Sequence, residues 1–110
     1  MVMSMLGGFA VQADEGEKVV INFYEHSDSD VIAEDLVEAY NASQDKVEVK
    51  LSLISNDDYD DKIKVMLAGD ADVDVLWIRG GDSARKMAEN GAILAIDDYM
   101  AANDVDFSVY

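Results

Sequence analysis

The stretch "DVDVLWIRGGD", residues 72–82, decides the fold class of this chain. Its centre, residues 73–78, is apolar at every position except Asp74, which is typical of a parallel strand buried on both faces. An arginine and two glycines follow at once, and Asp82 or Ser83 then offers an N-cap for a helix. This is the pattern of an open α/β sheet, in which ligands bind where the strands end.

Two further strands are predicted upstream of this stretch. Residues 18–24, "KVVINFY", are rich in β-branched and aromatic side chains. Residues 47–54, "VEVKLSLI", alternate between apolar and polar positions, as a half-buried strand does. Because the strand at 18–24 carries apolar side chains on both faces, we expect it to be central. The three strands are then parallel and lie in the spatial order 2-1-3.

The segments between and after the strands show helical periodicity. Residues 27–29 offer an N-cap, and an apolar stripe follows at Ile32, Ala33, Leu36, Val37 and Tyr40. A second helix ends at Gly69 and carries a stripe at Tyr59, Ile63, Met66 and Leu67. A third has Ala84, Met87 and Ala88 inside and a left-handed C-cap at Asn90 and Gly91. Residues 97–104 begin another short helix. This alternation predicts a three-layer α/β fold with right-handed crossovers.

Composition narrows the classes of function. The chain has 110 residues, of which 50% are hydrophobic, so it contains enough apolar material for one packed domain. Its formal net charge is −16, with 8 Lys and Arg against 24 Asp and Glu. Such a charge repels nucleic acid and anionic membranes and favours a monomer. Nucleic acid is therefore excluded as a partner.

The first residues are compatible with a secretory signal. Residues 2–11 form an apolar run that is too short to span a bilayer, and acidic residues begin at Asp14. Val11 and Ala13 occupy the small-residue positions of a cleavage site. No basic segment precedes the run, so a buried hydrophobic segment is the alternative. We expect residues 1–13 to be the remnant of a signal peptide and residues 14–110 to be the folded part.

The sequence contains no catalytic or metal-binding motif that we can identify. It has no cysteine and a single histidine, His26, so neither a Cys–His pair nor a zinc cluster can form. "DSDSD" and "DADVD" lack the glycine and glutamate that a calcium-binding EF-hand loop requires. The nucleophile elbow and the glycine-rich phosphate loops are also absent. We expect no catalytic residue, no metal site and no cofactor.

The carboxyl ends of the predicted strands remain as a candidate ligand-binding surface. Arg79 can donate a planar fork of hydrogen bonds, and carboxylates and amides accept from hydroxyls. Glycines let a backbone approach a ligand closely. Such groups suit a polyhydroxylated solute, although these loops could also serve only to cap helices. The candidate site residues are Glu25, His26, Ser27, Asn56, Asp57, Arg79, Gly80, Gly81 and Asp82.

The order of these segments resembles the N-terminal lobe of extracellular solute-binding proteins of ABC importers, in the carbohydrate-binding, maltose-binding-protein-like group. The likeness is strongest over residues 47–100. The chain departs from the family pattern at residues 43–46 and at Val73, where family members commonly have proline. The matching positions are Tyr59, Lys62, Leu67, Gly69, Asp74, Val75, Gly91, Leu94, Asp97 and Tyr99.

The resemblance implies a periplasmic-binding-protein-like (type II) fold, with residues 14–110 forming part of the N-terminal lobe. Family members have a second lobe and clamp a solute between the two. The resemblance thus implies an extracytoplasmic, non-enzymatic protein that captures a sugar or oligosaccharide and delivers it to the membrane permease of an ABC importer. Residues 79–82 would face the cleft, whereas Trp77 would pack in the core. The alternative is a complete flavodoxin-like signalling or enzyme domain.

Overall fold

The computed structural model describes residues 16–106 and 108, so the predicted signal remnant, residues 1–13, lies outside the described residues. Its contacts divide the chain into two compact units, one ending at Trp77 and one beginning at Ile78. The first unit contains β1 (Val19–His26), a 3-10 turn η1 (Ser27–Ser29), α1 (Asp30–Ser43), β2 (Val47–Ile54), α2 (Asn56–Ala68) and β3 (Val75–Leu76). The second contains α3 (Asp82–Glu89) and α4 (Asp97–Ala102).

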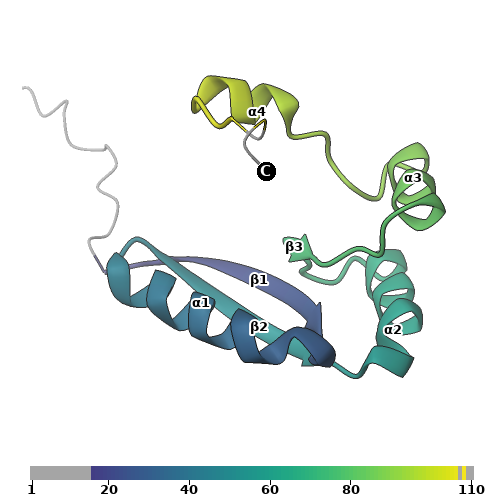
Figure 1. Ribbon diagram of the computed structural model, residues 1–110, viewed down its shortest axis with the longest axis horizontal. Coiled ribbons are helices and arrows are strands. Elements are labelled where there is room, and N and C mark those ends of the chain that lie inside the picture. The colour runs from purple at the N-terminus through teal and green to yellow at the C-terminus, as the bar shows by residue number, and fades with distance from the viewer. Residues whose placement is uncertain (1–15, 107, 109–110) are drawn as a thin grey trace, which may run out of the picture. The chain divides into compact units, whose positions relative to one another are not determined.

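The strands of the first unit form one parallel sheet in the order β2-β1-β3 (Figure 1). The β1–β2 ladder runs without interruption from the pair Val19–Val47 to the pair His26–Ile54. The predicted parallel α/β fold, strand order and central first strand are confirmed. However, β1 continues to His26, beyond its predicted end at residue 24.

The third strand is shorter and less buried than its sequence predicts. Only Val75 and Leu76 pair with β1, opposite Phe23 and Tyr24. The strand lies at the edge of the sheet, and Val75 is 46% exposed. The prediction of a strand over 73–78 that is covered on both faces is therefore wrong. An apolar run indicates burial but does not set the length of a strand. Because β3 has a neighbour on one side only, it stays paired with β1 for a short distance.

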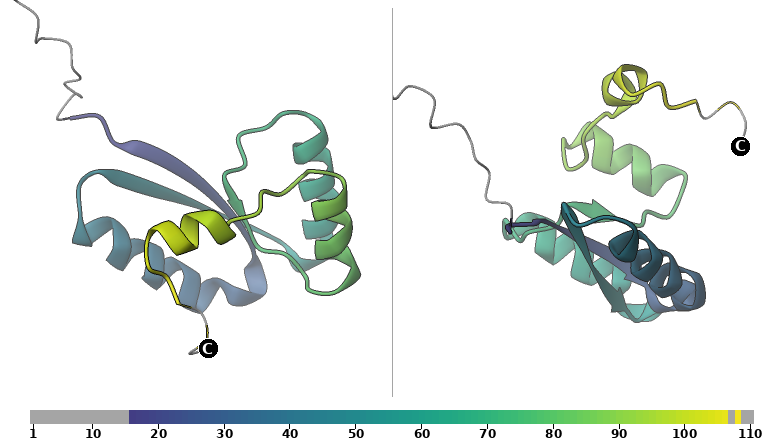
Figure 2. Two further views of the ribbon diagram at one scale, coloured as in Figure 1. Left: turned by 90° about the horizontal axis from the view of Figure 1, so that it is seen from above. Right: turned by 90° about the vertical axis from the view of Figure 1, so that its left-hand side faces the viewer.

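Helix α1 runs along β1 and β2 (Figures 1 and 2). Its period matches the prediction, but the buried side is narrower. Ala33 is buried at 6% exposure, whereas Ile32, Leu36 and Tyr40 are 66%, 63% and 45% exposed. Part of the predicted inner stripe thus lies uncovered. Together with the edge residue Val75, these three side chains form an exposed apolar strip, which we call the α1 strip.

Helix α2 supplies the most buried side chains of the first unit, Tyr59 and Ile63, at 2% and 1% exposure. The ring of Tyr59 contacts His26 of β1, and Glu25, one position earlier, borders a hollow beneath α1. Successive residues of a strand point to opposite faces, so α1 and α2 cover opposite faces. The predicted three-layer arrangement is confirmed.

The outer edge of β2 is covered by side-chain amides from the last turn of α1 and from the residue directly after it. The Asn41 amide donates to the Val49 carbonyl and accepts from the Val49 N–H, both at 2.9 Å. Gln44 does the same at Val47, donating at 2.7 Å and accepting at 2.8 Å. These two amides therefore reproduce the hydrogen bonds that a neighbouring strand would make.

The second unit begins with a segment that ends at Gly81, the N-cap of α3, where φ is 76°. The prediction of Asp82 or Ser83 as N-cap is therefore wrong, because the helix already includes Asp82. The predicted left-handed end is confirmed at Gly91, with φ of 70°. The Ala92 N–H bonds the Met87 carbonyl at 2.9 Å, closing a Schellman motif. Within the described part of the chain, no helix is long and apolar enough to cross a membrane.

Replacing Asp70 with glycine is expected to stabilise the folded protein. It follows the α2 C-cap Gly69 with φ of 54°, in the left-handed region, while the next N–H, from Ala71, bonds the Met66 carbonyl at 3.1 Å. Glycine adopts this conformation without steric cost, although it has more freedom to lose on folding. Asp70→Gly should thus raise the free energy of unfolding by about 0.5 kcal/mol in urea denaturation.

The matched control is Asp72→Gly, which changes an exposed residue of the same loop whose φ is not positive. This control should lower stability slightly, because it only adds freedom to the unfolded chain. Equal losses in both variants would contradict the strain at Asp70.

Candidate ligand-binding site

The last two residues of β1 point to opposite sides of the sheet. Glu25 is 9% exposed and borders a hollow that Phe23, Ala33 and Leu36 also line. His26 lies on the α2 side, where its ring meets Tyr59 and Trp77. The sequence placed Glu25 and His26 together because both were assigned to a loop. Since β1 includes them, strand alternation separates them.

The rings of His26, Tyr59 and Trp77 form a packed aromatic cluster. The centroids of His26 and Trp77 are 4.2 Å apart, and those of Tyr59 and Trp77 are 5.9 Å apart, with both pairs edge-on. Edge-on packing places the positive ring edge of one residue against the negative ring face of another. Trp77 is half-buried, so its ring both packs in this cluster and keeps an accessible part.

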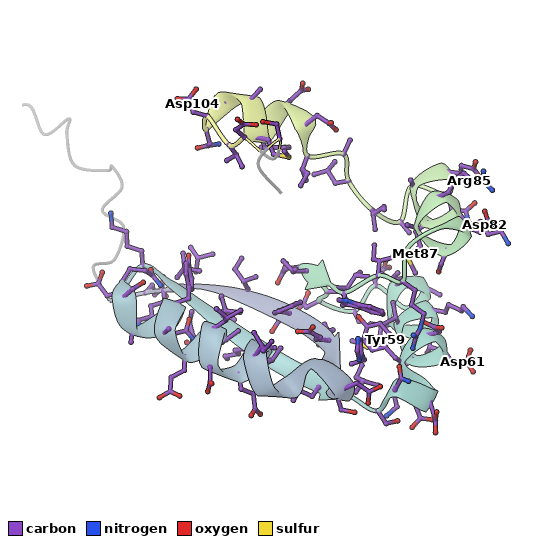
Figure 3. All side chains as sticks on the ribbon, viewed as in Figure 1. Tyr59, Asp61, Asp82, Arg85, Met87 and Asp104 are labelled. Carbon is purple, nitrogen blue, oxygen red and sulfur yellow. The ribbon has the colours of Figure 1, made fainter. Side chains whose placement is uncertain are left out.

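Tyr59 also holds the main chain. Its hydroxyl lies 3.0 Å from the Tyr24 carbonyl oxygen and 2.7 Å from that of Trp77. Figure 3 shows Tyr59 on the inner side of α2, while Asp61 extends from the outer side. The helical period places Tyr59 in the buried stripe of α2 and indicates no role for its hydroxyl. The available signal was the hydroxyl itself, because a tyrosine that is buried on a helix usually finds a hydrogen-bond partner.

The candidate residues after β2 lie in the first turn of α2. Asn56 is half-buried and Asp57 is exposed. Ser55 is the N-cap of α2, but its side chain makes no capping bond to a backbone N–H. Its hydroxyl donates instead to the Asp58 carboxylate at 2.8 Å. Ser27 belongs to the 3-10 turn after β1 and is half-buried.

The remaining candidate residues belong to the second unit. Arg79 is half-buried, and Gly80 and Gly81 are exposed. The Asp82 carboxylate accepts a hydrogen bond from the Arg85 guanidinium at 2.6 Å on the exposed face of α3 (Figure 3). An exposed pair of this kind contributes at most about 1 kcal/mol to stability. It does, however, orient the Asp82 carboxylate toward its own helix.

The carboxyl ends of β1 and β2 carry hydrogen-bond acceptors and aromatic rings, with Glu25 on the α1 side of the sheet and His26 on the α2 side. Glu25, Asn56 and Asp57 can accept hydrogen bonds from hydroxyls. Among the described residues, no group of three or more His, Cys, Asp or Glu side chains is arranged to hold a metal ion. These groups are able to take part in polar recognition.

The family model of bacterial extracellular solute-binding proteins matches residues 25–110. The chain belongs to this family. Searches among curated proteins and among solved structures gave no match. As a family member, this solute-binding protein has an extracytoplasmic, ABC-type substrate-binding role and recognises a small-molecule solute. The family is generally non-enzymatic. The membership favours the binding module over the flavodoxin-like alternative.

Proposed function

We propose that this solute-binding protein captures a neutral polyhydroxylated solute, a sugar or oligosaccharide, and presents it to the permease of an ABC importer. The observation that carries the proposal is the set of groups at the carboxyl ends of β1 and β2. Carboxylate and amide oxygens can accept from sugar hydroxyls, and the half-buried Trp77 packs against His26 at the end of β1. Arg79 would add a planar donor.

The charge of the protein favours a neutral solute over an anionic one. The net charge is −16, and the α2 N-terminus already carries Asp57 and Asp58 in its first turn. These carboxylates occupy the positive end of the helix dipole, where an anionic ligand would otherwise bind. A phosphate or carboxylate solute would be repelled, whereas hydroxyl groups would meet suitable acceptors.

The same proposal includes the domain organisation. Residues 1–13 are the remnant of a signal peptide, and residues 14–110 are part of the N-terminal lobe of a two-lobed protein. The exposed α1 strip supports this view. Its neighbouring apolar side chains are 66%, 63%, 46% and 45% exposed, and a contiguous exposed apolar patch usually marks a surface that another part of a protein covers. The high like charge favours a monomer.

Calorimetry with maltotriose tests the proposed function, with citrate as the anionic comparison. We expect a two-lobed protein that contains this chain to bind maltotriose at micromolar or tighter affinity and to ignore citrate. The 110-residue chain alone should bind no tighter than about 1 mM, or about −4 kcal/mol. A single lobe leaves the solute half solvated, so its hydrogen bonds only replace those with water. Tight citrate binding and no sugar binding would refute the proposal.

In that two-lobed protein, Arg79→Ala should weaken maltotriose binding about tenfold, which corresponds to roughly 1.4 kcal/mol. The substitution removes a charge-assisted donor from the cleft. Arg85→Ala is the matched control, because Arg85 is exposed and bonds Asp82 on its own helix. Equal affinities for the two variants would assign Arg79 to a solvated loop.

A further inference from the structure

Tyr59 joins three elements of the first unit at one point. The side chain comes from α2 and is 2% exposed. Its hydroxyl proton is shared between the carbonyl oxygens of Tyr24 in β1, at 3.0 Å, and of Trp77, at 2.7 Å. The Trp77 N–H donates to the same Tyr24 carbonyl at 2.9 Å. The hydroxyl therefore reinforces the last hydrogen bond between β1 and the chain that follows β3.

That point needs reinforcement because β3 is so short. Its ladder contains only Val75 and Leu76, and it lies at the edge of the sheet. At its amino end, Asp74 adds two bonds to Asn22, one from its backbone and one to its carboxylate, at 3.2 and 2.8 Å. At its carboxyl end, the Tyr59 hydroxyl takes the corresponding role. Trp77 is also the last residue before the segment that contains Arg79.

We propose that Tyr59 is a positioning residue for ligand binding. Its hydroxyl holds the Trp77 carbonyl and its ring packs edge-on against the Trp77 and His26 rings. It thereby fixes the position at which the main chain leaves the sheet after Trp77, and it fixes the orientation of the Trp77 ring. The consequence for binding rests on the proposed function, but the consequence for the main chain does not.

The experiment is amide hydrogen exchange by NMR on the 110-residue chain with Tyr59→Phe. Phenylalanine fills the same space and removes only the hydroxyl. We expect the Trp77 amide to exchange at least tenfold faster, while the amides of Lys50 and Ser52 change less than threefold. These two alternate with the outward-facing Val47 and Val49 amides and therefore face β1 in the β1–β2 ladder. Tyr40→Phe, at a partly exposed position of α1, is the control and should leave all three amides unchanged. If the hydroxyl only stabilised the fold as a whole, the exchange rates of all three amides would rise by the same factor in Tyr59→Phe. That result would overturn the proposal.

The emission of Trp77, the only tryptophan, gives a second readout. It should shift to longer wavelength in Tyr59→Phe at temperatures where the far-UV circular dichroism is unchanged. If the variant does not fold, trimethylamine N-oxide, which favours compact states, is added before the exchange is measured. A variant that stays unfolded even then would show that the hydroxyl supports the whole unit, and positioning would be rejected.

Binding provides the last step. In the two-lobed protein, Tyr59→Phe should weaken maltotriose three- to tenfold, and Tyr40→Phe should not. An unchanged affinity together with faster Trp77 exchange would refute the link to binding. Because exchange is measured without solute, absence of any sugar binding in the unaltered protein would reject the proposed function and leave the exchange result intact.

Discussion

Replacing Ile63 with alanine is expected to lower the free energy of unfolding by about 3 kcal/mol. Ile63 is 1% exposed, and it and Tyr59 are the largest fully buried side chains in the described part of the chain. The substitution removes apolar volume and leaves a cavity that the surrounding sheet and helix cannot close. Because domains of this size are stable by only about 5–15 kcal/mol, the loss is a large fraction of the total.

Urea denaturation followed by far-UV circular dichroism measures this loss. Val65→Ala is the matched control, since Val65 lies on the same helix and is 72% exposed. Its substitution should change stability by less than about 0.5 kcal/mol. Similar losses in the two variants would mean that α2 does not pack through the face that carries Tyr59 and Ile63.

The helical period identified this face correctly from sequence. Tyr59 and Ile63 are one turn apart and both are buried, and the helix ends at the predicted Gly69. The strand order was predictable for a similar reason. The strand β1 carries apolar residues on both of its faces, and it has a neighbour on each side. These features depend on local pattern and on connection rules, which a sequence contains.

The extent of burial on α1 and β3 was not predictable in the same way. A period shows which residues share a side of a helix, but not how much of that side a partner covers. The sheet is wide enough to bury Ala33, yet Leu36 and Tyr40 extend past β1 toward the short edge strand and remain 63% and 45% exposed. Their exposure depends on the length of β3, which follows from tertiary pairing.

The candidate site shows a comparable limit. Glu25 and His26 were grouped because they are adjacent in sequence, and a strand that is two residues longer places them on opposite faces. The clamp between Tyr59 and Trp77 joins residues 18 positions apart through a backbone carbonyl. No residue pattern encodes such a bond, since any residue could supply the carbonyl.

The amides on the β2 edge also bind backbone groups that no residue pattern predicts. Removing one of them is expected to have the second large effect on stability. Open strand edges pair readily with other chains, and proteins usually protect them. Here Asn41 and Gln44 satisfy both backbone groups of Val49 and of Val47, at distances of 2.7–2.9 Å. Both amides belong to α1 or to the turn directly after it. Helix packing and edge protection are therefore coupled through a few residues.

Replacing Asn41 with alanine should lower the free energy of unfolding by about 2–3 kcal/mol, because it removes two partly buried hydrogen bonds and leaves the Val49 N–H and carbonyl with only water to bind. It should also promote concentration-dependent association through the uncovered edge, visible by analytical ultracentrifugation as a shift from monomer to dimer.

Ser43→Ala, which removes an exposed hydroxyl bonded to the Tyr40 carbonyl at 2.7 Å, is the control and should cost less than about 0.5 kcal/mol without association. Asn41→Asp separates the two roles of the amide: the carboxylate can still accept from Val49 but cannot donate, so it should lose stability while its added charge opposes pairing. An Asn41→Ala chain that is as stable and as monomeric as the Ser43→Ala chain would show that water protects this edge as well as the amide does.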